Sequence, residues 1–140
     1  MSTQEKYKLK GCLNISGDKS ISHRSVILGA MSIGQMEIHN LLESKDIMST
    51  INILRKLGVK IKKNNEVWIV NGVGTCGFKQ PKQKLDAGNS GTTSRLMFGA
   101  VATNPINTTF TGDKSLSSRP MSRVTNFLED IGVKINLTKN

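Results

Sequence analysis

The chain of 140 residues is poor in cysteine, proline and aromatic side chains, with two cysteines, three prolines and 4% aromatic residues. Cys12 and Cys76 lie far apart and match no metal-ligand spacing, so the sequence indicates neither a zinc site nor a disulfide. We expect two buried or half-buried thiols without a redox role. No apolar run approaches the ~20 residues that a membrane-spanning helix needs, and the opening residues are polar. We therefore expect a cytoplasmic protein.

Acidic residues are also scarce, with 10 against 20 basic ones, and the net charge of +10 raises the alternative of a basic nucleic-acid-binding module without enzymatic activity. Nucleic-acid surfaces usually interleave aromatic side chains with the cations, and this pattern is absent here. The lysines are scattered, at Lys56, Lys60, Lys62, Lys63, Lys79, Lys82 and Lys84. We therefore expect small anions, and not nucleic acid, to be the partners.

One stretch, Ser16–Arg24, combines a glycine turn with Lys19, Ser20 and Arg24 at the start of an apolar helix pattern. The first turn of a helix has unpaired backbone N–H groups and a partial positive charge, which favour bound phosphate or carboxylate. A lysine adds a point charge and an arginine adds a planar fork. The stretch predicts an anion-binding helix N-terminus, although its Ser, Asp and Gly could equally serve as ordinary caps.

Two later stretches repeat this composition. Asn89–Arg95 is a small polar turn before an apolar helix pattern, and Gly112–Pro120 nearly repeats the first stretch, including Gly-Asp-Lys-Ser. Three such stretches in a short chain favour anion binding over capping alone.

Hydrophobic periodicity predicts a mixed α and β fold of the α+β type with two layers. Ser44 is expected to cap a helix, Gly34 and Gly58 to end helices, and the Asn64-Asn65 pair to form a tight turn with positive φ. The expected strands span residues 9–15, 35–42, 59–63, 66–70, a short stretch from 85, 107–111 and 133–137, and the expected helices span residues 22–31, 45–57, 92–102 and 121–131.

The order of these elements repeats. Gly17 and Gly88 are separated by the same number of residues as Arg24 and Arg95, and Gly58 and Gly132 by three more. We predict two βαβαββ units, at about residues 9–71 and 85–140, joined by a connector at 72–84, with the second unit incomplete.

These stretches resemble the amino-terminal part of the 5-enolpyruvylshikimate-3-phosphate (EPSP) synthase family. The resemblance rests on Gly17-Asp18-Lys19-Ser20 with Arg24, on Gly88-Asn89-Ser90-Gly91-Thr92 with Arg95, and on Ser118-Arg119-Pro120. It extends nearly from end to end of a chain that has about a third of the family's length. It implies part of one enolpyruvyl transferase domain of the inverse α/β barrel type, with residues 1–140 as an amino-terminal fragment.

The resemblance also implies a reaction. The family transfers the enolpyruvyl group of phosphoenolpyruvate to the 5-hydroxyl of shikimate 3-phosphate, without a metal or cofactor, and is the target of glyphosate, which occupies the phosphoenolpyruvate subsite. It acts in the shikimate pathway to chorismate and the aromatic amino acids, and a full-length monomer is expected. The carboxylates that transfer protons come from later family sequence, so we expect no catalytic residue here and an inactive isolated chain.

Roles transfer only to matching positions. The resemblance assigns shikimate 3-phosphate to Lys19, Ser20 and Arg24, phosphoenolpyruvate to Lys19, Gly91 and Arg119, and the shape of the pocket to Asn89, Thr92 and Arg95. His23 and His39 match no motif and are expected to be structural, while Asp18, Asp46, Asp86 and Asp113 are expected at turns or helix starts. A nucleotide-sugar enolpyruvyl transferase of wall synthesis is the related alternative, but Lys-Asn would be expected there in place of Lys19-Ser20.

Overall fold

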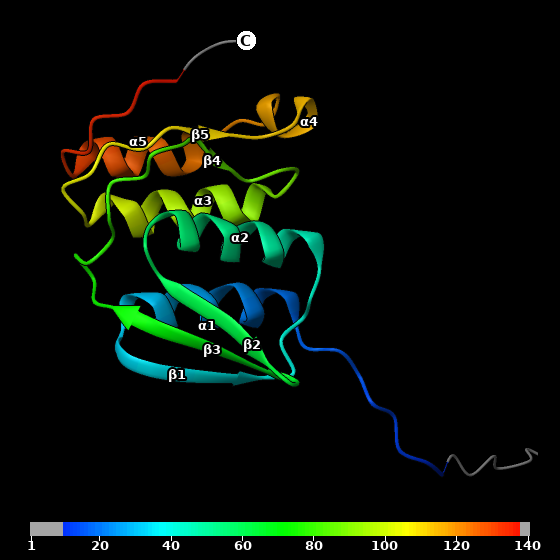
Figure 1. Ribbon diagram of the computed structural model, residues 1–140. Coiled ribbons are helices and arrows are strands. Elements are labelled where there is room, and N and C mark those ends of the chain that lie inside the picture. The colour runs from blue at the N-terminus through cyan, green and yellow to red at the C-terminus, as the bar shows by residue number, and fades with distance from the viewer. Residues whose placement is uncertain (1–9, 138–140) are drawn as a thin grey trace, which may run out of the picture.

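The computed structural model describes residues 10–137 and contains two small sheets with helices between them (Figure 1). Strands β1 (Ile33–His39), β3 (Val67–Val73) and β2 (Lys60–Asn64) form an antiparallel sheet in that order. Strands β4 (Leu85–Asp86) and β5 (Phe110–Thr111) form a short parallel pair. The helices are α1 (Lys19–Met31), α2 (Lys45–Lys56), α3 (Gly91–Ala102), α4 (Lys114–Ser117) and α5 (Ser122–Asp130). The expected mixed α and β fold is confirmed.

The helices α1, α2 and α3 contact one another, and α3 also contacts α5. Figure 1 shows α1 over one face of the three-stranded sheet, α2 and α3 beyond it, and α5 next to the β4–β5 pair. Helices α1, α2, α3 and α5 all begin at the same end of the molecule, on the right in this view. The partial positive charges of their N-termini therefore lie toward one side.

The core is built on the apolar face of α2 that the sequence predicts. Ile47, Ile51, Leu54 and Leu57 are fully buried, and Ile53 is 1% exposed. They pack with residues of α1, α3 and the sheet, among them Val26, Ala30, Val70, Leu85 and Met97. Burial of these aliphatic side chains holds the three helices against one another.

The helix caps agree with the sequence, with one exception. The Ser44 side chain accepts a hydrogen bond from Ile47 N, and Gly58, with φ +92°, follows the end of α2. Asn65 has φ 52° in the β2–β3 turn, as expected of one residue of the Asn pair. The exception is Gly34, which the sequence predicts to end the first helix. Helix α1 stops earlier, at Met31, and Gly34 lies in β1 with φ +97°.

Two predicted strands are absent from the described residues. Residues 10–15 and 133–137 have no strand assignment, and residue 9 of the first prediction lies outside the described range. A strand requires a partner for its backbone groups, and among residues 10–137 neither segment has one. The strand predicted at 107–111 is reduced to Phe110–Thr111 for the same reason, since only Leu85–Asp86 pairs with it.

The prediction that the two thiols are buried or half-buried is wrong, because Cys12 and Cys76 are both exposed. Cys12 lies in the segment before α1. Residues 10–16 of this segment are all exposed, so the Cys12 side chain does not pack against the core. Cys76 lies in the connector, where its Sγ contacts the backbone oxygen of Thr103 at 3.2 Å. No helix within residues 10–137 is long and apolar enough to cross a membrane.

Candidate substrate-binding site

The first candidate group lies in the first two turns of α1. Asp18 caps the helix by accepting a hydrogen bond from Ile21 N at 2.7 Å, so Lys19 and Ser20 occupy the first turn. Gly17 packs directly against the backbone oxygen of Asn40, where a Cβ would clash. Arg24 donates from Nη1 to the Ser20 backbone oxygen at 3.1 Å, and this bond holds its guanidinium beside Ser20. All three predicted residues are exposed and can be reached by a ligand.

Lys19 connects α1 to α2 through an ion pair with Asp46, which lies in the first turn of α2. The lysine side chain is 50% exposed and the aspartate side chain 27% exposed. One acceptor does not use all the donors of an ammonium group, so Lys19 keeps donors for a bound anion. Asp46, expected only as a helix-start residue, thus fixes the position of a predicted ligand-binding lysine.

Two guanidinium groups, those of Arg95 and Arg119, lie close to Gly91 at the start of α3. A Cβ added to Gly91 would lie 2.9 Å from Arg95 Nη1 and 3.3 Å from Arg119 Nη1. Gly91 is buried, while Arg95 and Arg119 are half-buried. The unpaired N–H groups of this helix start and two permanent positive charges therefore converge at one place, which suits a phosphate or carboxylate.

Hydrogen bonds orient both arginines. Arg119 donates from Nη2 to Asn89 Oδ1 at 2.6 Å and to Ser115 Oγ at 3.3 Å. Arg95 donates from Nη2 to the Pro120 backbone oxygen at 3.2 Å. The predicted residues Asn89, Gly91, Arg95 and Arg119 are therefore brought together.

Asp113 holds Asn89, the residue that orients Arg119. Asn89 donates from Nδ2 to Asp113 Oδ2 at 2.5 Å, and Leu116 N donates to Asp113 Oδ1 at 2.7 Å. The hydrogen bond from Asn89 and then that from Leu116 hold the pKa of the Asp113 carboxyl below its usual value of 3.8. The second Gly-Asp-Lys-Ser stretch therefore forms the single-turn helix α4, whose cap carboxylate positions Asn89.

A hydroxyl group joins the two halves of the candidate site. Thr93 Oγ1 donates to the backbone oxygen of Asp46 at 3.1 Å, which ties α3 to the residue that pairs with Lys19. Thr92 is exposed on the same first turn of α3. The predicted residues on α1 and α3 thus line one end of the helix layer, the end where the helices begin in Figure 1.

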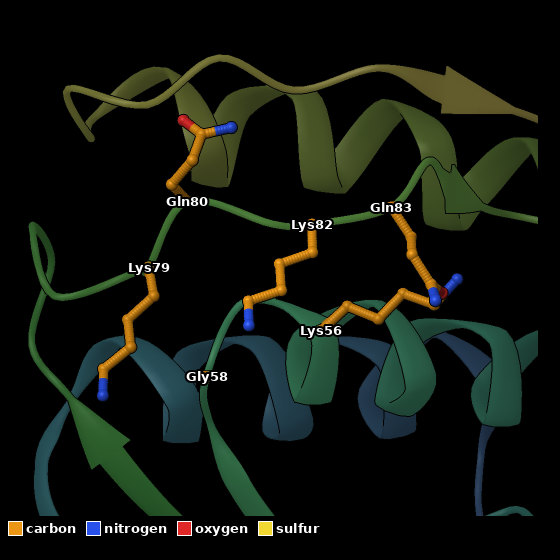
Figure 2. Close-up of a pocket in the computed structure, with 6 residues that line it drawn as sticks. All are labelled: Lys56, Gly58, Lys79, Gln80, Lys82 and Gln83. Carbon is orange, nitrogen blue, oxygen red and sulfur yellow. The ribbon is translucent and has the colours of Figure 1, made fainter.

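A pocket of about 300 Å³ lies elsewhere, beside the C-terminal end of α2 (Figure 2). It contains none of the predicted site residues. Gln80 donates to the Asn107 backbone oxygen at 2.6 Å, and Lys56 donates to the Lys84 backbone oxygen at 3.0 Å. Two of its side chains therefore fasten the connector to neighbouring segments. Its lining residues are Lys56, Gly58, Lys79, Gln80, Lys82 and Gln83.

Sequence reasoning did not assign a role in the site to three residues that support it, Asp46, Asp113 and Thr93. Each acts on a residue of another helix or loop, and contacts over such sequence separations have no local pattern. Among residues 10–137, no group of three or more His, Cys, Asp or Glu side chains could hold a metal ion.

Comparisons with known proteins identify the family of this chain. The family model for EPSP synthase (3-phosphoshikimate 1-carboxyvinyltransferase) matches residues 3–140. A 3-phosphoshikimate 1-carboxyvinyltransferase of Novosphingobium aromaticivorans is 50% identical over 127 residues, which cover 90% of this chain and 29% of the relative. One from a Bradyrhizobium species is 52% identical over 128 residues, which cover 91% of this chain and 29% of the relative.

A solved structure is also similar. The EPSP synthase of Acinetobacter baumannii superposes with a TM-score of 0.88 at 38% identity, over 92% of this chain and 29% of that chain. The mixed α and β architecture is that of part of an enolpyruvyl transferase domain. The chain belongs to the EPSP synthase family, and it spans about 29% of the length of the relatives it matches.

Proposed function

We propose that this chain contributes one part of the substrate site of an enzyme that transfers the enolpyruvyl group from phosphoenolpyruvate to the 5-hydroxyl of shikimate 3-phosphate. The products are 5-enolpyruvylshikimate 3-phosphate and inorganic phosphate. The observation that carries the proposal is the position of the Arg95 and Arg119 guanidiniums over Gly91, at the start of α3. Family membership supports the choice of substrates.

Phosphoenolpyruvate is assigned to the α3 side. Its phosphate or carboxylate would accept hydrogen bonds from the first-turn N–H groups at Gly91 and from Arg119, while Lys19 would approach from α1. Asn89 keeps Arg119 in place, since the two share a 2.6 Å hydrogen bond. Gly91 provides room, because it has no side chain between the ligand and the helix start.

Shikimate 3-phosphate is assigned to the α1 side, to Lys19, Ser20 and Arg24. The Ser20 hydroxyl and the Arg24 fork lie within one helical turn of each other, and a bidentate contact to an anionic oxygen pair is the strong form of such binding. Lys19 pairs with Asp46 on α2, and the Asp46 backbone oxygen lies 3.1 Å from Thr93 Oγ1 on α3. Lys19 is therefore the cation that would touch both substrates.

The chemistry required of these residues is electrostatic. The 5-hydroxyl oxygen gives up its proton and bonds to C2 of phosphoenolpyruvate while C3 takes a proton, which forms a tetrahedral intermediate. Loss of phosphate from C2 and of a proton from C3 then restores the double bond. Fixed cations and helix N-termini stabilise the anionic groups throughout and hold the two reactants together. The groups that transfer protons are proposed to lie outside this chain, which by itself is proposed to be inactive.

Transfer by the complete protein that carries this chain tests the proposal. Purified protein is incubated with phosphoenolpyruvate and either shikimate 3-phosphate or a nucleotide-sugar acceptor, and the products are identified by mass spectrometry. We expect 5-enolpyruvylshikimate 3-phosphate with the first acceptor and no product with the second. The reverse result would assign the chain to the wall-synthesis enzymes instead.

The proposal extends to a monomeric cytoplasmic protein that has small anionic substrates and no nucleic-acid partner. The low aromatic content of 4% and the scattered lysines support the last point. Retention on immobilised DNA or RNA that is salt-dependent, without binding of shikimate 3-phosphate, would support the basic binding module.

A further inference from the structure

Beneath the candidate site, a buried chain of polar side chains joins α1, α2 and α3. His23 Nδ1 is 2.9 Å from Thr50 Oγ1, which is 2.9 Å from Thr93 Oγ1. Thr93 Oγ1 in turn donates to Ser90 Oγ at 2.8 Å or to the Asp46 backbone oxygen at 3.1 Å. His23, Thr50 and Thr93 are fully buried, and Ser90 is 1% exposed.

Each end of this polar chain lies close to a residue of the site. His23 is one residue from Arg24 and four from Lys19 on α1, whereas Ser90 caps α3 immediately before Gly91. Between them, the Asp46 backbone oxygen lies within hydrogen-bond distance of Thr93 Oγ1, and the Asp46 side chain pairs with Lys19. Hydrogen bonds are directional, unlike aliphatic packing, so the polar chain determines how the three helix starts sit relative to one another.

Only one nitrogen of the imidazole takes part. Within the described residues, the buried Nε2 atom has no hydrogen-bond partner, so Nδ1 alone ties His23 to the polar chain. Burial lowers the pKa of His23, Lys19 and Arg24 on α1 lower it further, and Asp46 on α2 acts in the opposite direction. The imidazole is therefore neutral near pH 7.

We propose that His23 is a positioning residue. It acts through Thr50 and Thr93 to fix the position of the start of α3 relative to Lys19 on α1. The inference rests on the proposed function for its kinetic part. Loss of the Nδ1 contact of His23 should loosen α3 relative to α1. A ligand held by both helices, phosphoenolpyruvate, should be weakened more than one held by α1, shikimate 3-phosphate.

Substitution of His23 by asparagine or glutamine distinguishes the roles of the two ring nitrogens. An asparagine amide reaches the place of Nδ1, and a glutamine amide reaches that of Nε2. The variants His23→Asn, His23→Gln, His23→Leu and Thr50→Val are made in the complete protein. Ile69→Ala is the matched control, because Ile69 is buried on β3 outside the main core cluster. It should lower stability without touching the polar chain.

Two readouts are measured on every variant. Hydrogen exchange by mass spectrometry follows the segment 89–96, and steady-state kinetics give KM for each substrate. For His23→Leu, His23→Gln and Thr50→Val we expect exchange about tenfold faster and KM for phosphoenolpyruvate raised about fivefold, with KM for shikimate 3-phosphate changed less than about twofold. His23→Asn should stay within about twofold of the parent in both readouts.

The proposal is overturned if His23→Leu leaves exchange in 89–96 unchanged, or if Ile69→Ala reproduces the same changes. It is also overturned if both KM values rise equally or if His23→Gln matches His23→Asn. If the parent protein transfers no enolpyruvyl group, the proposed function fails, while the exchange measurement still decides the role of His23.

Discussion

Arg119 donates a hydrogen bond to the side-chain oxygen of Asn89 across 2.6 Å, although thirty residues separate them in the sequence. Asn89 uses its amide nitrogen on Asp113 at the same time. Asp113 therefore fixes the Asn89 amide, and the amide in turn holds the Arg119 guanidinium close to the start of α3. Asn89 is accordingly expected to act through Arg119, and need not touch a substrate itself.

Removal of this link should weaken phosphoenolpyruvate binding. Asn89→Ala leaves Arg119 with its charge and its 3.3 Å contact to Ser115 Oγ, but removes its shorter hydrogen bond. The lost hydrogen bond is worth about 0.5–1.5 kcal/mol at an exposed site. KM for phosphoenolpyruvate should rise roughly two- to twelvefold, by the conversion of about 1.4 kcal/mol per tenfold. Steady-state kinetics of the complete protein measure it, with Asn71→Ala on β3 as the control. Equal KM values in both variants would remove Asn89 from the site.

Gly91→Ala should separate an inhibitor from the substrate. The new methyl group would meet the ends of two arginine side chains at 2.9 and 3.3 Å, and φ at Gly91 is not in the positive range. The guanidiniums can yield, so the stability of the fold should change by less than about 1 kcal/mol. Glyphosate is bulkier than phosphoenolpyruvate, so its inhibition constant should rise more than KM does. An equal rise in both constants would mean that Gly91 does not discriminate between these ligands.

Arg24→Lys tests the fork of the guanidinium. The substitution keeps the positive charge but loses bidentate geometry and the contact with the Ser20 backbone oxygen. Binding of shikimate 3-phosphate should weaken by about 1–3 kcal/mol. Calorimetry on the complete protein gives the affinity directly. An unchanged value would assign Arg24 to the structure of α1 alone.

The buried imidazole predicts a pH dependence of stability. Burial places the pKa of His23 in the folded protein below its ordinary value of 6.5. As pH falls through that ordinary value, the unfolded chain binds a proton that the folded chain does not, so unfolding becomes easier. The urea midpoint should fall between about pH 7 and 5, and His23→Asn should reduce that fall. His39→Asn, at a histidine whose side chain is 72% exposed, should leave it unchanged.

Local patterns predicted most of the helices. The apolar spacing of α2, the Ser44 cap and Gly58 are all short-range signals, and the structure confirms each. Strands depend on partners elsewhere, which explains why residues 10–15 and 133–137 do not form the strands that their alternation predicts. Exposure depends on what covers a segment, and for that reason the prediction for Cys12 and Cys76 was wrong.

The site shows the same division. The Gly, Ser, Lys and Arg of the helix starts could be read from sequence because an anion-binding turn is a local motif. Pairings such as Lys19 with Asp46, Asn89 with Asp113 and His23 with Thr50 join different elements and become visible only in three dimensions. The ligand-binding roles and the two-unit division of the chain stay predictions.

Phosphate release tests the central claim most directly, namely that this chain supplies one part of an enolpyruvyl transferase site. The complete protein and the isolated 140-residue chain are each mixed with phosphoenolpyruvate and shikimate 3-phosphate, and inorganic phosphate is measured over time. We expect saturable release that requires both substrates from the complete protein, and release no faster than a protein-free control from the isolated chain. Turnover by the isolated chain, or none by the complete protein, would contradict the account.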